Sequence, residues 1–173
     1  MKPLILLLAL CVLWPSSASA YTIYTREALV QSFFPTAEVE VISYTPPLEM
    51  AERLGYAPPQ SSYEIWVGRV KGEPVAYAIL DAQLGQHEPI SYAVLFDPRG
   101  SVLRVEITEY REAYGDGVKG EGFRRQFVGK NADSSLKLGR DIQFVSGATI
   151  SSRAITVGVR RDTLLMHDFL GLP

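Results

Sequence analysis

Four hydroxyl side chains gather around a glycine in the sequence Val-Ser-Gly-Ala-Thr-Ile-Ser-Ser, just before the longest helical stretch of the chain. Ser146, Thr149, Ser151 and Ser152 supply the hydroxyls, and Gly147 permits a tight backbone turn. Free N–H groups at a helix start, together with the positive end of the helix dipole, favour a phosphate. A plain helix cap made by Ser or Thr is the second interpretation of the same residues. The segment therefore predicts either an anion site or a simple cap.

Other candidate motifs in the chain are weaker. The stretch Gly115–Gly120 matches G-x-G-x-x-G, but the strand before it ends several residues early and more glycine follows, so a dinucleotide fold is not expected. His87 and His167 lack the spacing of metal ligands, and no Ser-His-Asp arrangement can be singled out. We therefore predict no metal site and assign no catalytic residue.

Composition indicates one packed domain. The 173 residues are 47% hydrophobic and 21% charged, with a net charge of −2. No long basic run is present, which argues against a nucleic-acid partner.

The N-terminus has the pattern of a secretory signal. Lys2 precedes an apolar run, Leu4–Trp14, that is too short to span a bilayer, and Ala18-Ser19-Ala20 is an A-x-A cleavage signal. A retained membrane anchor is the alternative. We expect residues 1–20 to be a signal peptide and residues 21–173 to be the mature domain, in the periplasm or otherwise outside the cytoplasm, without a transmembrane segment. Cleavage would also remove Cys11, which leaves no thiol for a disulfide or haem attachment.

The elements that would position these residues can be predicted from periodicity and turn residues. Alternating segments separated by short turns predict an antiparallel meander of the strands Glu38–Tyr44, Tyr63–Val70, Val75–Leu80, Ile90–Phe96 and Val102–Thr108. Helices are expected at Tyr21–Phe34, with Thr25 as its cap, and at Pro46–Gly55, Phe123–Val128 and Ile150–Phe169. The predicted class is α+β: a single domain with an antiparallel sheet core and flanking helices, including a C-terminal helix after Ser-Gly-Ala-Thr.

The last helix is expected to be amphipathic. Its core-facing positions would be apolar, and Arg153 and Arg160 would point outward. The predicted core positions are Ile150, Ala154, Val157, Leu164 and Leu165.

The segment Asp141–Ala154 resembles the signature of the FMN-binding domain family, which includes the covalent-FMN subunits of sodium-pumping NADH–quinone reductases and of Rnf electron-transport complexes. In that family the Thr of Ser-Gly-Ala-Thr carries FMN through a phosphoester, made from FAD by a flavin transferase with release of AMP. The resemblance implies Thr149 as the attachment residue. It also implies a cofactor site that includes Ser146, Gly147, Ala148 and Ser151.

Two further segments carry the same resemblance, which covers roughly residues 63 to 165. Glu112–Gly117 is similar to the family's Glu-Thr-x-Gly-x-Gly, with Ala113 in place of Thr, and Phe123–Lys130 is similar to Phe-x-x-Gln-Phe-x-Gly-Lys. We interpret Glu112, Gln126 and Lys130 as residues near the flavin ring or phosphate, or else as exposed polar residues. Gly115 and Gly117 would let the backbone approach the flavin.

One position departs from the pattern. Gln143 stands where the family usually has an acid three residues before the Ser, and a Gln can hydrogen-bond but cannot serve as a base or metal-binding carboxylate. Covalent attachment therefore depends on whether this acid is required.

The resemblance implies an exported electron-transfer flavoprotein. Its partners would be a flavin transferase for maturation and a membrane-bound oxidoreductase or other redox protein. Two alternatives remain open: a flavin-dependent reductase of a small substrate, and a binding or sensor module without flavin, which Gln143 favours.

Overall fold

The computed structural model describes residues 21–173, so the predicted signal peptide and Cys11 lie outside the described residues. The core is a sheet of six strands in the order β1-β6-β5-β4-β3-β2. Strands β2 to β6 are antiparallel neighbours in chain order, which confirms the predicted meander. The bounds are β1 Tyr21–Thr22, β2 Glu38–Tyr44, β3 Tyr63–Val70, β4 Glu73–Leu84, β5 Pro89–Phe96 and β6 Val102–Tyr110.

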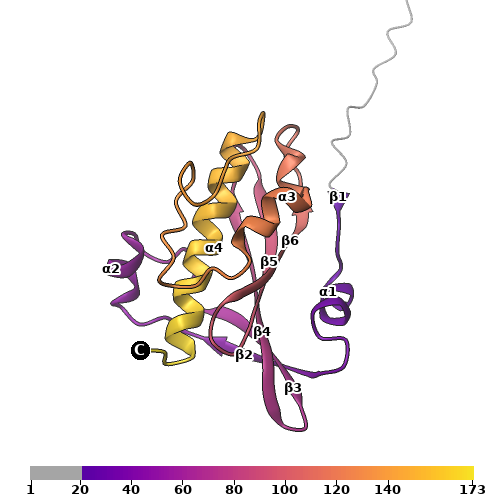
Figure 1. Cartoon of the computed structure of the whole chain (residues 1–173), viewed down its shortest axis with the longest axis vertical. Coiled ribbons are helices and arrows are strands. Elements are labelled where there is room, and N and C mark those ends of the chain that lie inside the picture. Colours follow the sequence, from indigo (N-terminus) through magenta and orange to yellow (C-terminus); the bar gives the residue numbers. More distant parts are fainter. Residues whose placement is uncertain (1–20) are drawn as a thin grey trace, which may run out of the picture.

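Helices flank both faces of the sheet (Figure 1). The helix α4 lies along one face and packs on the larger core, whereas α1 packs on the opposite face, where Leu29 and Phe33 join Trp66 of β3. The bounds are α1 Arg26–Phe33, α2 Met50–Leu54, α3 Glu121–Arg124 and α4 Thr149–Phe169, with 3₁₀ turns at Asp116–Lys119 and Arg125–Phe127. The predicted single α+β domain with a C-terminal helix is therefore confirmed. Between residues 21 and 173, no helix has the length and apolar character needed to cross a membrane.

Several predicted element boundaries are wrong. The first helix begins at Arg26 rather than Tyr21, because the Thr25 side chain caps it by accepting the N–H of Ala28 at 3.2 Å. Residues 21–22 instead pair with the end of β6. The second helix is limited to Met50–Leu54, and the predicted helix over 123–128 is divided between α3 and a 3₁₀ turn.

The face that α4 turns to the core also differs from the prediction. Ala154, Leu164 and Leu165 are buried as expected, but Ile150 is 48% and Val157 37% exposed. The core face carries polar residues and a glycine instead, namely Ser151, Ser152, Thr156, Gly158, Arg161, Asp162 and Thr163. A hydrophobic pattern could not reveal this face, because several of its positions are polar.

A buried polar cluster explains why polar residues face the sheet. The guanidinium of Arg161 contacts Asp81 of β4, with 2.5 Å between Nη2 and Oδ2, and donates through Nη1 to Gln83 at 2.8 Å. Asp162 is fully buried beside them, and its Oδ1 lies 3.7 Å from Arg161 Nε. Burial raises the pKa of Asp162 well above its ordinary value, the nearby Asp81 carboxylate adds to this rise, and Arg161 opposes it.

Candidate functional site

The first turn of α4 has no side-chain cap. The N-cap residue is Ala148, and no side chain within residues 21–173 caps the free N–H groups of the turn. Gly147, just before it, has φ of +74°, a left-handed conformation that favours glycine. The plain-cap interpretation of the hydroxyl cluster is therefore wrong, and the N–H groups at this helix start have no side-chain acceptor.

The hydroxyls of the cluster differ in their availability. Ser152 is fully buried, and its Oγ accepts the N–H of Val145 at 3.1 Å. Ser151 is 4% exposed, and its Oγ lies 2.9 Å from the hydroxyl of Tyr110, which donates to the carbonyl of Tyr114 at 2.6 Å. Because the single Tyr110 proton goes to Tyr114, the Ser151 hydroxyl donates to Tyr110. Ser146 and Thr149 are the exposed residues of the four.

A cleft of about 270 Å³ lies at this helix start. Its lining combines the turn before α4, the first turn of α4, the segment after β6 and the β4–β5 loop. The lining residues are Gln86, Glu112, Tyr114, Gly115, Gly147, Ala148, Thr149, Ile150 and Ser151. Six of the ten residues expected at the site, Thr149, Gly147, Ala148, Ser151, Glu112 and Gly115, are thus brought together.

Glu112 holds one wall of the cleft in place. Its Oε1 accepts the backbone N–H groups of His87 and Glu88, at 2.7 and 3.2 Å, and so fixes the loop between β4 and β5. Desolvation would raise the pKa of Glu112, but the N–H donors of His87, Glu88 and Gln86 outweigh it and lower the pKa below its usual value. An adjoining hollow of about 410 Å³ continues along this loop. The carboxylate therefore shapes the wall through the backbone of the loop.

The two motif glycines permit close packing. Gly115 has φ of +86°, and a Cβ added there would lie 2.6 Å from the Oγ of Ser151. A Cβ on Gly117 would lie 2.7 Å from a methyl of Val145. Gly115 forms part of the cleft surface, whereas Gly117 packs against the segment that precedes α4.

Gln126, Lys130 and Ser146 do not line the cleft. Gln126 accepts the N–H of Gln143 at 2.7 Å and donates to its carbonyl at 3.2 Å, so it holds the backbone of the segment before α4. The Lys130 carbonyl accepts the N–H of Val102 at 2.7 Å, at the start of β6. The side chain of Gln143 is exposed and contacts the carbonyl of Arg140 at 3.5 Å.

Sequence reasoning missed Gln86, Tyr114 and Ile150 in the lining, and Tyr110 beneath it. Tyr114 stands within the Glu112–Gly117 motif, which could have indicated it. Gln86 and Tyr110 enter the site only through the sheet, so no local signal marks them.

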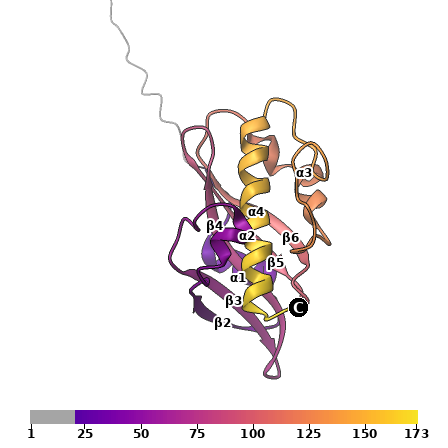
Figure 2. The same ribbon diagram turned by 90° about the vertical axis from the view of Figure 1, so that its left-hand side faces the viewer.

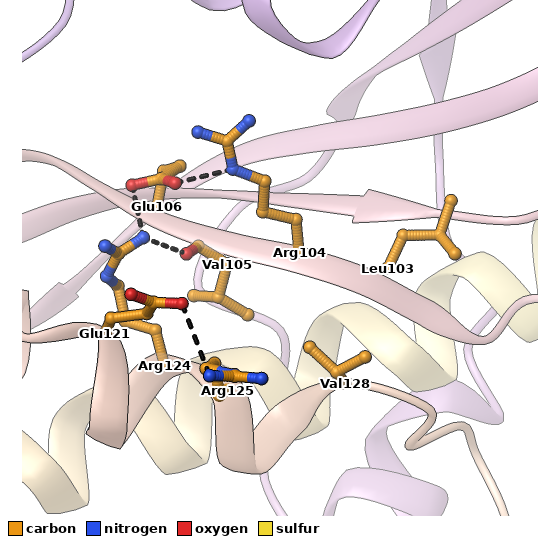
Figure 3. A pocket seen from close by; sticks show the side chains of 8 residues that line it. All are labelled: Leu103, Arg104, Val105, Glu106, Glu121, Arg124, Arg125 and Val128. Carbon is orange, nitrogen blue, oxygen red and sulfur yellow. Dashed lines mark hydrogen bonds and ion pairs between the residues drawn. The ribbon is translucent and has the colours of Figure 1, made fainter.

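A second cleft, of about 350 Å³, lies between β6 and α3 and contains none of the predicted site residues (Figure 3). Two of its arginines converge on the buried carboxylate of Glu106: Arg104 at 2.6 Å and Arg124 at 2.5 Å. Arg125 lies 3.6 Å from Glu121. Because each arginine already has a carboxylate partner, a phosphate here would have to displace an existing ion pair.

Comparison with known proteins identifies the domain that contains the cleft. The family model described as the FMN-binding domain matches residues 85–162, which include every predicted site residue. Residues 85–162 are an FMN-binding domain. The family resemblance seen in the sequence is thereby confirmed.

Curated relatives of this chain include components of two ferredoxin:NAD⁺ oxidoreductase complexes. The component from the Na⁺-translocating complex of Acetobacterium woodii is 26% identical over 148 residues, or 79% of this chain and 72% of the relative. The component from the proton-translocating complex of Clostridium ljungdahlii is 31% identical over 114 residues, or 61% of this chain and 62% of the relative. The second match therefore spans less than two thirds of that relative.

Two solved structures share the fold. One component of the Na⁺-translocating NADH-quinone reductase of Parabacteroides distasonis superposes with a TM-score of 0.51 at 15% identity, over 78% of this chain and 77% of that one. NqrC of Shewanella oneidensis superposes with a TM-score of 0.52 at 16% identity, over 86% of this chain and 77% of that one. At this identity the likeness concerns the fold alone.

Proposed function

We propose that this protein carries FMN through a phosphoester to Thr149 and transfers electrons to or from a membrane redox partner outside the cytoplasm. The observation that carries the proposal is the position of Thr149: this exposed residue lines the cleft at the uncapped start of α4. The neighbouring Ser151 and Ser152 hydroxyls are buried and hydrogen-bonded.

The residues present suit the flavin phosphate. The free N–H groups of the first turn of α4 and the positive end of its dipole would stabilise the phosphate charge next to Thr149. In the attachment step, a bond forms between Thr149 Oγ and the phosphorus of the FMN half of FAD. The bond from that phosphorus to the bridging oxygen of the diphosphate breaks, AMP leaves, and the hydroxyl proton passes to a base of the flavin transferase.

Loss of the cofactor after export favours a covalent link. A flavin that dissociated outside the cytoplasm would be diluted and lost, whereas a flavin bonded to Thr149 could not leave. FMN supplies one- and two-electron redox chemistry, and a cleft at the surface of the domain would leave a ring edge accessible to a partner.

The names of the relatives and the N-terminal sequence support the remaining parts of the proposal. Both curated relatives are named as components of ion-translocating oxidoreductase complexes, which favours a membrane redox protein as partner. The pattern of Lys2, the apolar run and Ala18-Ser19-Ala20 supports export.

The test is co-expression with a flavin transferase, followed by intact mass and visible spectroscopy. The wild type should gain the mass of one FMN less water and stay yellow after denaturation. Thr149→Ala should lose both, whereas Ser146→Ala, which removes the hydroxyl of the other exposed residue, should keep both. Covalent flavin on Thr149→Ala would refute this attachment residue. A wild type that never gains the mass would favour the module without flavin.

A further inference from the structure

The outer side of α4 carries a stripe that begins at the proposed attachment residue and stays exposed as far as Arg160, which is half-buried beside α2. Thr149, Arg153, Val157 and Arg160 follow at helical spacing on one face, and Ile150 lies beside them. Figure 2 shows α4 in front of the sheet. Thr149, Arg153 and Val157 are exposed, so this side of the helix faces solvent. Ile150 is 48% and Val157 37% exposed although both are large aliphatic residues on a long helix.

The arginines of this stripe lack acidic partners. Within residues 21–173, the arginines with no carboxylate inside 4.0 Å are Arg99, Arg153 and Arg160, and two of these lie on the stripe. Arg160 donates only to the backbone carbonyls of Arg53 and Leu54, each at 3.5 Å. Elsewhere on the described chain, every arginine except Arg99 has an Asp or Glu within 4.0 Å.

We propose that Ile150, Arg153, Val157 and Arg160 form the docking face for the redox partner, and that this partner presents an acidic rim around an apolar centre. The inference rests on the proposed function, because an electron carrier needs a partner close to its flavin. Exposed aliphatic side chains between uncompensated cations are complementary to such a surface. The stripe from residue 149 to residue 160 is about 16 Å long at 1.5 Å per residue. A partner seated on it lies beside Thr149.

Packing of α2 sets the limit of this face. Met50 and Leu54 of α2 belong to the same core cluster as Leu164, which is buried at 7% although it follows the stripe by helical spacing. The docking face is therefore the N-terminal half of α4, the half that ends at the cleft.

The test uses holo-protein whose flavin content is verified by intact mass. The probe is plastocyanin, a small blue copper protein with an acidic patch, and stopped-flow spectroscopy measures its reduction by the reduced flavoprotein. We expect Arg153→Glu to lower the second-order rate roughly tenfold at low ionic strength, with the difference shrinking as salt rises. Arg99→Glu is the matched control, because it makes the same charge change at another unpaired arginine, in the β5–β6 turn, and should change the rate less than twofold.

Two further measurements separate the possible failures. The rate at which benzoquinone, a small neutral acceptor, oxidises the reduced flavin should be equal in wild type and all variants. Equal rates would show that the flavin itself is unaltered. Equal plastocyanin rates for Arg153→Glu and Arg99→Glu would overturn the docking face but leave the proposed function intact. If the wild-type protein never carries FMN, both the docking face and the proposed function are overturned. Loss of binding to phosphatidylglycerol vesicles in Arg153→Glu, with unchanged plastocyanin rates, would assign the stripe to a membrane surface and overturn the protein partner.

Discussion

Substituting Gly115 tests a contact that forms part of the cleft surface, called here the cleft floor. In this contact Gly115, in the segment after β6, packs against Ser151 at the start of α4. In Gly115→Ala the new methyl meets two problems. The residue has φ of +86°, and a left-handed conformation costs a non-glycine residue roughly 1–2 kcal/mol. The Cβ would also lie 2.6 Å from Ser151 Oγ and 3.0 Å from the Tyr110 hydroxyl.

The steric cost of Gly115→Ala can be separated from the cost of its left-handed backbone conformation. Displacing Ser151 breaks its hydrogen bond with Tyr110, which contributes about 1 kcal/mol. We therefore expect Gly115→Ala to lower the free energy of unfolding by about 2–3 kcal/mol. Gly147→Ala is the matched control: its φ is +74°, but its Cβ would meet nothing within 4 Å, so only the backbone cost of about 1–2 kcal/mol applies.

The assay is urea unfolding followed by circular dichroism, with the flavinylated fraction measured in parallel. Combining Gly115→Ala with Ser151→Ala removes the clashing oxygen, so the double variant should be more stable than the sum of the single effects predicts. If Gly115→Ala and Gly147→Ala have equal effects, and Gly115 and Ser151 show no coupling, the contact does not hold the cleft floor.

Buried and loop-holding groups give three other predictions. Asp162→Asn should be more stable than wild type at pH 8 and lose this advantage toward pH 4, measured by thermal melts, because the raised pKa of Asp162 means that wild-type stability falls as pH rises through the folded pKa. Glu112→Ala should speed hydrogen exchange of the amides at 86–88, whereas Glu109→Ala, which breaks only a partly exposed ion pair, should not. Because the pKa of Glu112 is lowered, its carboxylate holds this loop at neutral pH, and acid that protonates the carboxylate should loosen the loop in wild type. Gly158→Ala should destabilise the protein by about 1–3 kcal/mol in chemical denaturation, because its methyl would overlap the phenol of Tyr92, and Tyr92→Phe should recover part of the loss.

The sheet could be predicted because its information is local. Alternation and short turns mark each strand from β2 to β6, and turn residues such as Asp97 and Gly100 mark where the chain reverses. The inward face of α4 could not be predicted in this way, although Arg153 is exposed as expected. Arg161 pairs with Asp81, 80 residues earlier, so this charged residue is buried in the core. The aliphatic Ile150 and Val157, which an apolar pattern places in the core, are exposed instead.

The candidate site could likewise be predicted only in part from local sequence. The turn before α4, the exposed Thr149 and the tight packing at Gly115 follow from short motifs, because backbone freedom and helix starts have local signatures. The contact of Tyr110 with Ser151, 41 residues apart, depends on the register of β6 beside α4. The same holds for the loop at 86–88, which reaches the cleft through Glu112.

The contacts among the three sequence motifs explain why they occur together. Gly115 packs on Ser151, and Gly117 packs on Val145. Gln126 holds both backbone groups of Gln143.

Each of these contacts joins one of the earlier motifs to the segment around Ser-Gly-Ala-Thr, and most of them do not face the cleft. Substitutions at Gly117 or Gln126 should therefore act by shifting the turn that presents Thr149, and not by removing a group that touches the flavin. The resulting defect would be slower attachment of the cofactor. The visible spectrum of the fraction that is modified would stay unchanged, because the surroundings of the attached flavin are made by other residues.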